Sequence, residues 1–360
     1  MMIVYRNENV LEAARKRIAK VFDSFDRIVV SVSSGKDSTC LYHLCLQEAE
    51  RRDRDIIVFF LDQEAEYQGT VDLMRILMQH ERVIPWWYQV PIDMTNATSF
   101  NAPFLRAWEP GVEWMREKEP NAITSITGDY PMRFYPFIDW LEQQQTEPTA
   151  FFVGLRSKES MNRFRAVTKN PGYKGIPWST KTKNDLCFRF YPIYDWTIGD
   201  VWKFIADEGV PYNSVYDRLY CLRGMRVRDI RISNLIHEKS FSCLTDLQEV
   251  EPDTYERLLR RISGIHCAAL YAKDSYIYNS DKLPERFKTW LEYRDYLLST
   301  TPGEYRERFA ARFAKQRADE TVYQQQCRQI LINDWENNIP VDQKKMEKRK
   351  ATLEKWRDLL

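Results

Sequence analysis

The fold is decided by the stretch Ile28-Val29-Val30-Ser31-Val32-Ser33-Ser34-Gly35-Lys36-Asp37-Ser38. Its apolar first half predicts a buried strand, and apolar residues at helical spacing from Cys40 to Cys45 predict a helix from Thr39. The turn rich in Ser and Gly between them leaves several backbone N–H groups free, and the N-terminus of the helix adds a partial positive charge. The stretch therefore predicts a phosphate-binding loop between a strand and a helix.

The side chains of this loop suit an anion. Lys36 carries a mobile charge, and Ser33, Ser34 and Ser38 offer hydroxyl donors to phosphate oxygens. The G-x-x-x-x-G-K-[ST] spacing of a Walker loop is absent, because Asp37 stands where Ser or Thr would be needed. Two roles remain open for Asp37, contact with Mg²⁺ or bracing of the loop backbone.

Strands alternate with helices in the first half of the chain. Apolar runs predict strands at 28–32, 56–61, 86–90 and 150–154. Helical periodicity predicts helices over 11–22 and around 71–78. This order favours an α/β fold with a parallel sheet covered by helices on both faces. In such sheets ligands bind beyond the carboxyl ends of the strands, where three polar segments fall: 33–38, 62–66 and 154–163.

The segment 154–163, Gly-Leu-Arg-Ser-Lys-Glu-Ser-Met-Asn-Arg, is a second motif that favours phosphate binding over solvated surface. Gly154 permits a turn at the end of a strand, and Arg156 and Arg163 can converge on one anion with their planar forks. Glu159 orients Arg163 at i,i+4 or helps to hold a metal. Asp62 ends the second strand, where a carboxylate binds Mg²⁺, a ribose hydroxyl or simply a helix N-terminus.

The sequence downstream of residue 190 predicts a capped helix and two aromatic blocks. Thr197 is typical of a helix N-cap, and Gly209 of a helix end. The blocks 191–197 and 210–217 are packing and turn elements or, alternatively, a shelf for a nucleobase. The five arginines within 218–231 are a candidate site for a second phosphate or for nucleic acid.

Composition sets the class of protein. The 360-residue chain has a net charge of +1, which offers no argument for nucleic-acid or membrane binding. No transmembrane span and no signal-peptide pattern is visible, so we expect a cytoplasmic protein. Seven cysteines without C-x-x-C spacing favour reduced core thiols, and no iron–sulfur cluster is expected. We expect two domains, an α/β nucleotide-binding domain over 1–244 and a mostly helical region over 245–360 with a charged tail.

The loop resembles the S-G-G-K-D-S signature of the PP-loop, or N-type ATP pyrophosphatase, superfamily. Together with the motif at 154–163 and the P-I-Y-D-W, D-V-W and P-Y-N blocks within 192–217, it resembles the phosphoadenosine phosphosulfate (PAPS) reductase family. The closest likeness is to the branch typified by the immunoglobulin-binding regulator A proteins. The resemblance implies an adenine nucleotide α-hydrolase-like, Rossmann-like fold whose loop grips the β- and γ-phosphates while chemistry occurs at the α-phosphate.

The resemblance also implies residue roles. Catalytic roles are expected for Lys36, Asp37 and Arg156, and Mg²⁺ ligands at Asp37 and Asp62. The expected nucleotide-binding residues are Ser33, Ser34, Gly35, Ser38, Asp62, Gly154, Glu159, Ser160 and Arg163.

Two departures from the family pattern stand out. Ser34 occupies a position where the superfamily usually has Gly; if that position needs φ > 0, Ser costs on the order of 1 kcal/mol. PAPS reductases carry a nucleophilic Cys in an E-C-G-x-H segment, whereas Gly264-Ile265-His266-Cys267 has these residues in another order. Because attack on a sulfonate needs a positioned thiolate, sulfonucleotide reduction is not expected.

The leading hypothesis is therefore an enzyme that cleaves ATP, or uses a 3′-phosphorylated adenine nucleotide, with Mg²⁺. Cleavage between the α- and β-phosphates would give AMP and pyrophosphate and adenylate an acceptor. Two alternatives stay open: sulfur transfer, as in the related DNA phosphorothioation proteins, and a nucleotide-sensing regulator without turnover. The branch implies an accessory role with a ParB-like or defence-system partner, with nucleic acid as a further candidate ligand.

Overall fold

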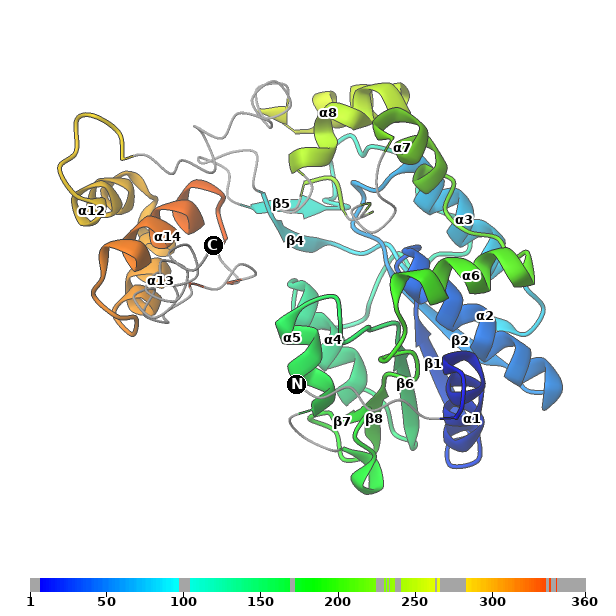
Figure 1. The fold of residues 1–360 in the computed structure, drawn as a ribbon. Helices are drawn as coiled ribbons and strands as arrows, with labels where there is room; N and C mark the ends of the chain where they lie inside the picture. Colours follow the sequence, from blue (N-terminus) through cyan, green and yellow to red (C-terminus); the bar gives the residue numbers. More distant parts are fainter. Residues whose placement is uncertain are drawn as a thin grey trace, which may run out of the picture. The chain divides into compact units, whose positions relative to one another are not determined.

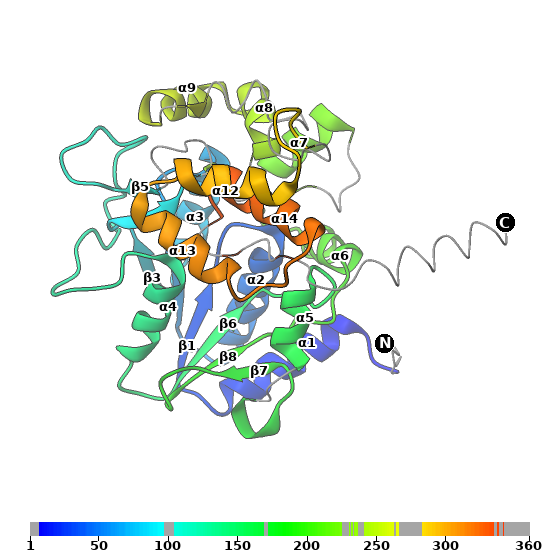
Figure 2. The ribbon, with the colours of Figure 1, turned by 90° about the vertical axis from the view of Figure 1, so that its left-hand side faces the viewer.

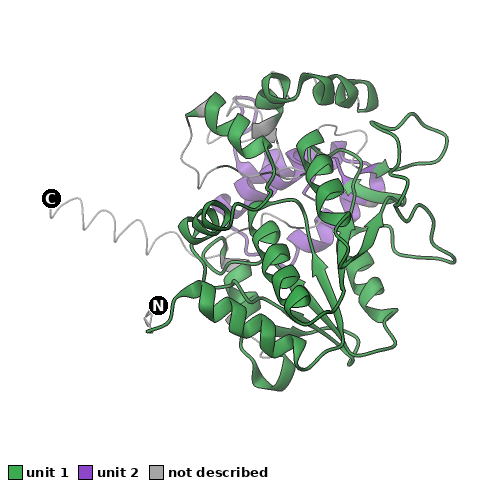
Figure 3. Ribbon diagram, turned by 90° about the vertical axis from the view of Figure 1, so that its right-hand side faces the viewer, with its two compact units in different colours: residues 1–94, 106–235, 243–262 green, residues 95–105, 236–242, 263–360 purple. Residues whose placement is uncertain are grey.

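The computed structural model describes residues 7–96, 104–168, 172–224, 230, 232, 234–236, 241–262, 264–265, 283–334, 337 and 341. The chain divides into two compact units (Figure 3). Unit 1 comprises residues 1–94, 106–235 and 243–262, and unit 2 comprises 95–105, 236–242 and 263–360. The expected domain division at residue 244 stays a prediction. The charged tail expected beyond Pro340 lies, apart from residue 341, outside the described residues.

Unit 1 is built on a six-stranded sheet in the order β3-β2-β1-β6-β8-β7 (Figure 1). The strands are β1 (Arg27–Ser31), β2 (Ile56–Leu61), β3 (Val83–Tyr88), β6 (Thr149–Val153), β7 (Ser179–Lys181) and β8 (Cys187–Phe190). Neighbouring strands pair in parallel except β7, which pairs antiparallel with β8. The predicted, mostly parallel sheet is confirmed. A separate two-stranded sheet pairs β4 (Ile92–Thr95) with β5 (Phe104–Ala107) and was not predicted.

The strand order places a topological switch at the centre of the sheet. From β1 the chain proceeds to β2 and β3 on one side and later to β6 and β8 on the other. Val29 of β1 pairs with Ile57 of β2 and with Phe151 of β6, so the carboxyl ends of these strands lie level. Ligands of open parallel sheets bind at such a point. Figure 2 shows β1, β6, β8 and β7 side by side.

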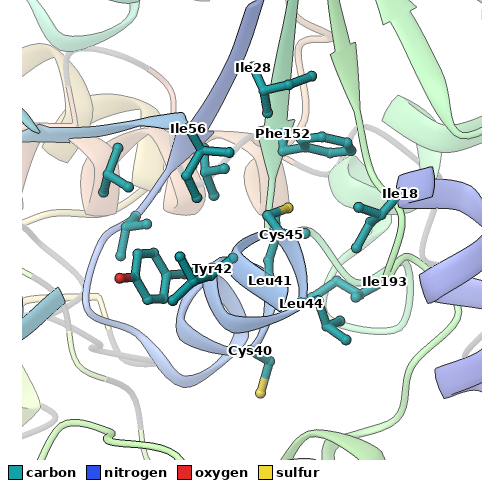
Figure 4. Close-up of a cluster of buried hydrophobic side chains, with 14 of the residues drawn as sticks. Ile18, Ile28, Cys40, Leu41, Tyr42, Leu44, Cys45, Ile56, Phe152 and Ile193 are labelled. Atoms are coloured by element: carbon teal, nitrogen blue, oxygen red, sulfur yellow. The ribbon is translucent and has the colours of Figure 1, made fainter. Parts of the chain in front are cut away.

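Helices cover both faces of this sheet. Apolar faces of α1 (Val10–Phe22), α2 (Lys36–Arg51), α3 (Gln68–Met78) and α6 (Ile198–Glu208) share one core with the inward residues of the central strands. Figure 4 shows Leu41, Leu44 and Cys45 of α2 gathered with Ile28 and Phe152. On the opposite face, Phe137 of α4 (Phe134–Gln143) packs edge-on against Tyr88 of β3, with the ring centroids 5.5 Å apart. Since β2 is buried at every position, its continuous apolar run follows from cover on both faces.

The helix predicted after Thr197 is α6. Thr197 and Asp200 form a reciprocal capping box at its start, and Gly209 ends it with φ +60°. Further helices of unit 1 are α5 (Met161–Thr168), α7 (Val215–Arg223) and α9 (Pro252–Arg261), with a short 3₁₀ turn at Tyr173–Gly175. The helix α8 spans Phe241–Val250.

Unit 2 contains α12 (Trp290–Thr300), α13 (Gly303–Phe313) and α14 (Glu320–Leu331). Leu297, Phe309, Phe313, Cys327 and Ile330 form its buried core. The mostly helical character expected after residue 245 is confirmed for the residues that the structure describes. Within those same residues, no helix combines the length and apolarity needed to span a bilayer.

Candidate functional site

The predicted phosphate loop connects β1 to α2 at the switch point of the sheet (Figure 1). The helix begins at Lys36 rather than at the expected Thr39, so Lys36, Asp37 and Ser38 form its first turn. Gly35 is the N-cap with φ −76°, and no side chain caps the helix from that position. The first backbone N–H groups of α2 and its positive dipole end therefore face the carboxyl end of the sheet, as an anion site requires.

The loop is closed by its own serines. The Ser38 hydroxyl donates to the Gly35 carbonyl at 2.9 Å and accepts from the Ser33 N–H at 3.1 Å. The hydroxyls of Ser33 and Ser38 lie 3.2 Å apart. These bonds hold the turn in shape before any ligand binds, which is the preorganisation that an anion cradle needs.

Ser34 adopts a left-handed conformation, with φ +58°. It is fully buried, and its Oγ accepts a hydrogen bond from Nδ2 of Asn213 at 3.1 Å. The same amide group donates to Oγ1 of Thr70 at 3.0 Å. A neutral hydrogen bond contributes about 1 kcal/mol, which is comparable to the cost of a left-handed serine. The hydrogen bond to Asn213 thus offsets the cost of the left-handed conformation of Ser34.

The three expected catalytic side chains meet in one buried cluster. The Asp37 carboxylate lies 3.4 Å from Nζ of Lys36 through Oδ2, and its Oδ1 accepts from Nε of Arg156. Lys36 is 7% exposed and Arg156 is 6% exposed, so solvent screens these charges little. Two cations and one carboxylate leave the cluster with one net positive charge beside the N-terminus of α2.

Gly154 brings the second motif against this turn. The Leu155 N–H donates to the Val153 carbonyl at 2.8 Å, which confirms a turn at the end of β6. A Cβ on Gly154 would lie 2.8 Å from both Cα and N of Ser38, closer than real Cβ contacts come. The glycine is therefore needed for close approach of β6 to the first turn of α2, and not for a left-handed φ.

The remaining residues of the second motif brace each other. Nη1 of Arg163 pairs with Oε2 of Glu159 at 2.6 Å, which confirms the predicted i,i+4 interaction. The Ser160 hydroxyl accepts from the Arg163 N–H at 3.2 Å, as an N-cap of α5 does. Arg156 and Arg163 thus have separate carboxylate partners. Their convergence on one anion, and the nucleotide contacts of Glu159 and Ser160, stay predictions.

Asp62 lies fully buried at the end of β2. Its carboxylate accepts from the Trp87 indole and the Gln89 amide, both at 2.8 Å, and from Nη2 of Arg116. It also accepts from the Glu64 N–H at 3.0 Å. These donors occupy the lone pairs of the carboxylate, so Asp62 anchors the carboxyl ends of β2 and β3. Its expected contacts to nucleotide and Mg²⁺ stay predictions that this arrangement does not favour.

The residues after Asp62, which belong to the predicted polar segment 62–66, form a buried network whose distant partners the sequence did not predict. Glu64, with φ +63°, accepts from Nε of Arg261 at 2.7 Å and from the Trp108 N–H at 2.7 Å. Burial, together with the nearby Asp62 carboxylate, raises the pKa of Glu66 to about 8. Glu66 is therefore mostly protonated at neutral pH. Among the described residues, no group of three or more His, Cys, Asp or Glu side chains is arranged to hold a metal ion.

The loop is completed by a segment far downstream. The Tyr216 hydroxyl accepts from the backbone N–H of Lys36 at 3.1 Å, and Nζ of Lys36 lies 5.6 Å from the centre of the Tyr216 ring. Gly69 permits this docking, since a Cβ there would lie 2.8 Å from Val215 and 2.9 Å from Asn213. The block 210–217 carried the only sequence signal for these contacts. Its packing interpretation is confirmed, and its role as a nucleobase shelf stays a prediction.

The thiols on α2 are poorly suited to sulfur chemistry. Cys40 and Cys45 are fully buried, and burial raises the pKa of both thiols. Cys187 and Cys327 are also buried, and Cys221 is exposed. His266 and Cys267, and the arginines of the cluster at positions 226, 228 and 231, lie outside the described residues.

A phosphate-type loop at the switch point of a parallel sheet defines an α/β protein of the Rossmann-like class. A family model, the phosphoadenosine phosphosulfate reductase domain, matches residues 27–267, and the chain belongs to this family. A second model, a domain of unknown function, matches residues 224–318.

Curated relatives agree with this family. The uncharacterized protein YbdN of Escherichia coli (strain K12) is 31% identical over 85% of this chain and 79% of its own length. The adenosine 5′-phosphosulfate reductase of Staphylococcus epidermidis (strain ATCC 35984) is 27% identical over 54% of this chain and 66% of its own length. Among solved structures, the Candida glabrata FMN adenylyltransferase in complex with FAD and inorganic pyrophosphate is 12% identical to this chain, with a TM-score of 0.35. It covers 60% of this chain and 64% of that chain, a likeness too low to support an inference.

Proposed function

We propose that this chain binds an adenine nucleotide at the loop 33–38 and cleaves ATP between the α- and β-phosphates. A nucleophile on an acceptor would attack the α-phosphorus, the bond to the bridging oxygen would break, and pyrophosphate would leave. The products are an adenylated acceptor, or AMP where water is the acceptor, and pyrophosphate. A 3′-phosphorylated adenine nucleotide is the alternative ligand of the same loop.

The observation that carries this proposal is the cluster of Lys36, Asp37 and Arg156 at the first turn of α2. Both cations share one carboxylate, that of Asp37. A pyrophosphate group carries more negative charge than a single carboxylate and accepts several hydrogen bonds, so it competes well for these cations. Charge that develops on the leaving pyrophosphate is then stabilised by groups already in place, which is electrostatic rather than covalent catalysis.

Mg²⁺ fits this proposal only as a partner of the nucleotide. Asp62 is saturated by protein donors, and Asp37 is shared by Lys36 and Arg156. Mg²⁺ usually keeps several waters and binds one or two carboxylates together with substrate phosphates. The ion would neutralise phosphate charge, and of the two expected ligands Asp37 is the one beside the loop.

The test is incubation with ATP labelled at the α-phosphate, with Mg²⁺, and separation of AMP from ADP. We compare wild type with Lys36→Ala and with a matched control, Lys203→Ala, which removes a lysine 74% exposed on α6. The proposal expects AMP from wild type and from the control, and at least 100-fold less from Lys36→Ala. Equal AMP from all three chains, or ADP as the product, would contradict it.

A second candidate function is a nucleotide sensor without turnover. The favouring observation is that Asp37 already neutralises one of the two charges of Lys36 and Arg156, so a ligand must compete with this carboxylate. A sensor predicts that ATP raises the melting temperature by mass action while no AMP forms. Either AMP formation or the lack of any shift would exclude it.

Sulfur transfer, by analogy with DNA phosphorothioation proteins, gains no support from the described thiols. Cys40 and Cys45, although on the loop helix, are buried with raised pKa. If this chain carried the sulfur, a variant lacking all cysteines would be inactive.

The motif resemblance also supports membership of the immunoglobulin-binding regulator A branch and an accessory role beside a ParB-like or defence-system protein. Nucleic acid is the alternative acceptor. Adenylation of a candidate partner, followed as label transfer from the α-phosphate, would test this part of the proposal.

A further inference from the structure

Tyr216 is a buried residue whose hydroxyl contacts the first turn of α2, directly after the loop. Tyr216 is 3% exposed. Its ring packs edge-on against Trp202, with the ring centroids 5.2 Å apart and an interplanar angle of 85°. Its oxygen lies 3.1 Å from the Lys36 N–H and 3.9 Å from the position that a Cβ on Gly35 would take. The hydroxyl therefore stands at the first turn of α2, where an anion would bind.

The hydroxyl proton of Tyr216 lacks an acceptor among the residues that the structure describes. A phenol oxygen both accepts and donates, and here it accepts from Lys36. Burial raises the pKa of this hydroxyl well above its ordinary value of 10, and the carboxylates of Asp37 and Glu159 contribute, so the proton stays on. A buried donor without a partner costs on the order of 1–3 kcal/mol. This hydroxyl is thus available to donate to an acceptor that the described residues do not supply.

The surroundings specify the chemistry of that acceptor. Nζ of Lys36 lies 5.6 Å from the centre of the Tyr216 ring, Arg156 pairs with the adjacent Asp37, and the N-terminus of α2 adds its partial charge. An oxyanion with several acceptor oxygens suits this position better than a neutral ligand.

We propose that Tyr216 donates its hydroxyl proton to a phosphate oxygen of the bound nucleotide. The phosphate site is then shared between the loop and α7, which lies 180 residues further along the chain. This inference rests on the proposed function, because it presumes that a nucleotide binds at the loop. It adds a binding residue that neither phosphate motif contains.

The neighbouring Tyr212 provides a matched control. It meets the same Trp202 ring edge-on, at 5.5 Å and 87°, but its hydroxyl donates to the Asp217 carboxylate at 2.8 Å. Removing that hydroxyl takes away a hydrogen bond to a carboxylate without touching the loop. Both substitutions to Phe keep the ring packing.

The experiment measures binding of α,β-methylene-ATP and of inorganic pyrophosphate, with Mg²⁺, by titration calorimetry. Tyr216→Phe is expected to weaken both ligands about tenfold, and Tyr212→Phe less than twofold. The melting temperature of each ligand-free chain is measured as well. A merely structural role would lower the melting temperature of Tyr216→Phe and leave the affinity of the folded chain unchanged.

The outcomes separate the two claims. Wild type that binds neither ligand would refute the proposed function and, with it, the inference. Wild type that binds, with equal or tighter binding by Tyr216→Phe, would refute the inference alone, since the Lys36 N–H would then be the better donor. If Tyr216→Phe does not fold, 3-fluorotyrosine placed at position 216 gives a ¹⁹F signal that should shift with pyrophosphate. An unchanged signal would equally overturn the inference.

Discussion

Replacing Gly154 with Ala tests the contact that joins the two phosphate motifs. The new methyl carbon would lie 2.8 Å from both Cα and N of Ser38 and 3.0 Å from the Asp37 carbonyl carbon. Carbon atoms pack best at about 3.5–4.0 Å, so β6 and the first turn of α2 would have to separate by most of an ångström. The obstructing atoms belong to the backbone, and no side-chain rotation can relieve the clash.

The expected cost follows from this geometry. Overpacking a rigid core costs about 1–3 kcal/mol, and we expect Gly154→Ala to lower the free energy of unfolding by that amount. Because the displaced turn carries Lys36 and Asp37, AMP formation should also fall at least tenfold in chains that remain folded. The control is Gly199→Ala on α6, where a Cβ would meet only Oγ1 of Thr197 at 3.6 Å. Helix propensity predicts that this control is neutral or stabilised by up to about 1 kcal/mol.

Urea unfolding followed by circular dichroism gives both free energies, and the labelled-ATP assay gives the activity. A Gly154→Ala chain as stable as the Gly199→Ala chain, with wild-type affinity for pyrophosphate, would refute the reasoning. It would mean that β6 and α2 can separate without cost and that the loop does not depend on their contact.

Substitutions at two further positions, 34 and 66, probe the carboxyl ends of the strands. Ser34→Gly relieves the strain of the left-handed φ but loses the hydrogen bond to Asn213, so its free energy of unfolding should stay within about 1 kcal/mol of wild type. Ser34→Ala keeps the strain and loses the hydrogen bond, so its free energy of unfolding should fall by about 1–2 kcal/mol. Urea unfolding measures both, and a Ser34→Ala chain as stable as wild type would show that the bond contributes nothing. The pKa of Glu66 is about 8 in the folded chain, against an ordinary value of 4.5. Its contribution to the free energy of unfolding is therefore fully present below pH 4.5 and is lost as the pH rises to 8. The loss is at most about 1.4 kcal/mol per pH unit. Glu66→Gln should flatten that slope between pH 5 and 8 and leave the chain more stable than wild type at pH 8; an unchanged slope would place the titrating group elsewhere.

The prediction for the third strand shows where local patterns mislead. The aromatic run suggested a strand over 86–90, whereas β3 spans Val83–Tyr88 and includes Pro85. β3 lies at the edge of the sheet, where a proline that cannot donate a hydrogen bond is tolerated. The short strands β4, β5, β7 and β8 escaped prediction because three or four residues carry too little periodicity.

The sequence by itself determined the features that depend on neighbouring residues. These are the buried strands β1, β2 and β6, the loop that follows β1, the capping box at Thr197 and the pairing of Glu159 with Arg163. Each arises from spacing of one to six residues, which apolar periodicity and helix geometry translate directly into structure.

Only the tertiary structure decided what completes the site. Asp37 meets Arg156 across 119 residues, Lys36 meets Tyr216 across 180, and Ser34 meets Asn213 across 179. The contacts of Asp62 with Trp87, Gln89 and Arg116 are likewise a product of tertiary packing. Strand order and close approach, as at Gly154, are set by packing of the whole core, and no local pattern records which distant residues that packing brings together.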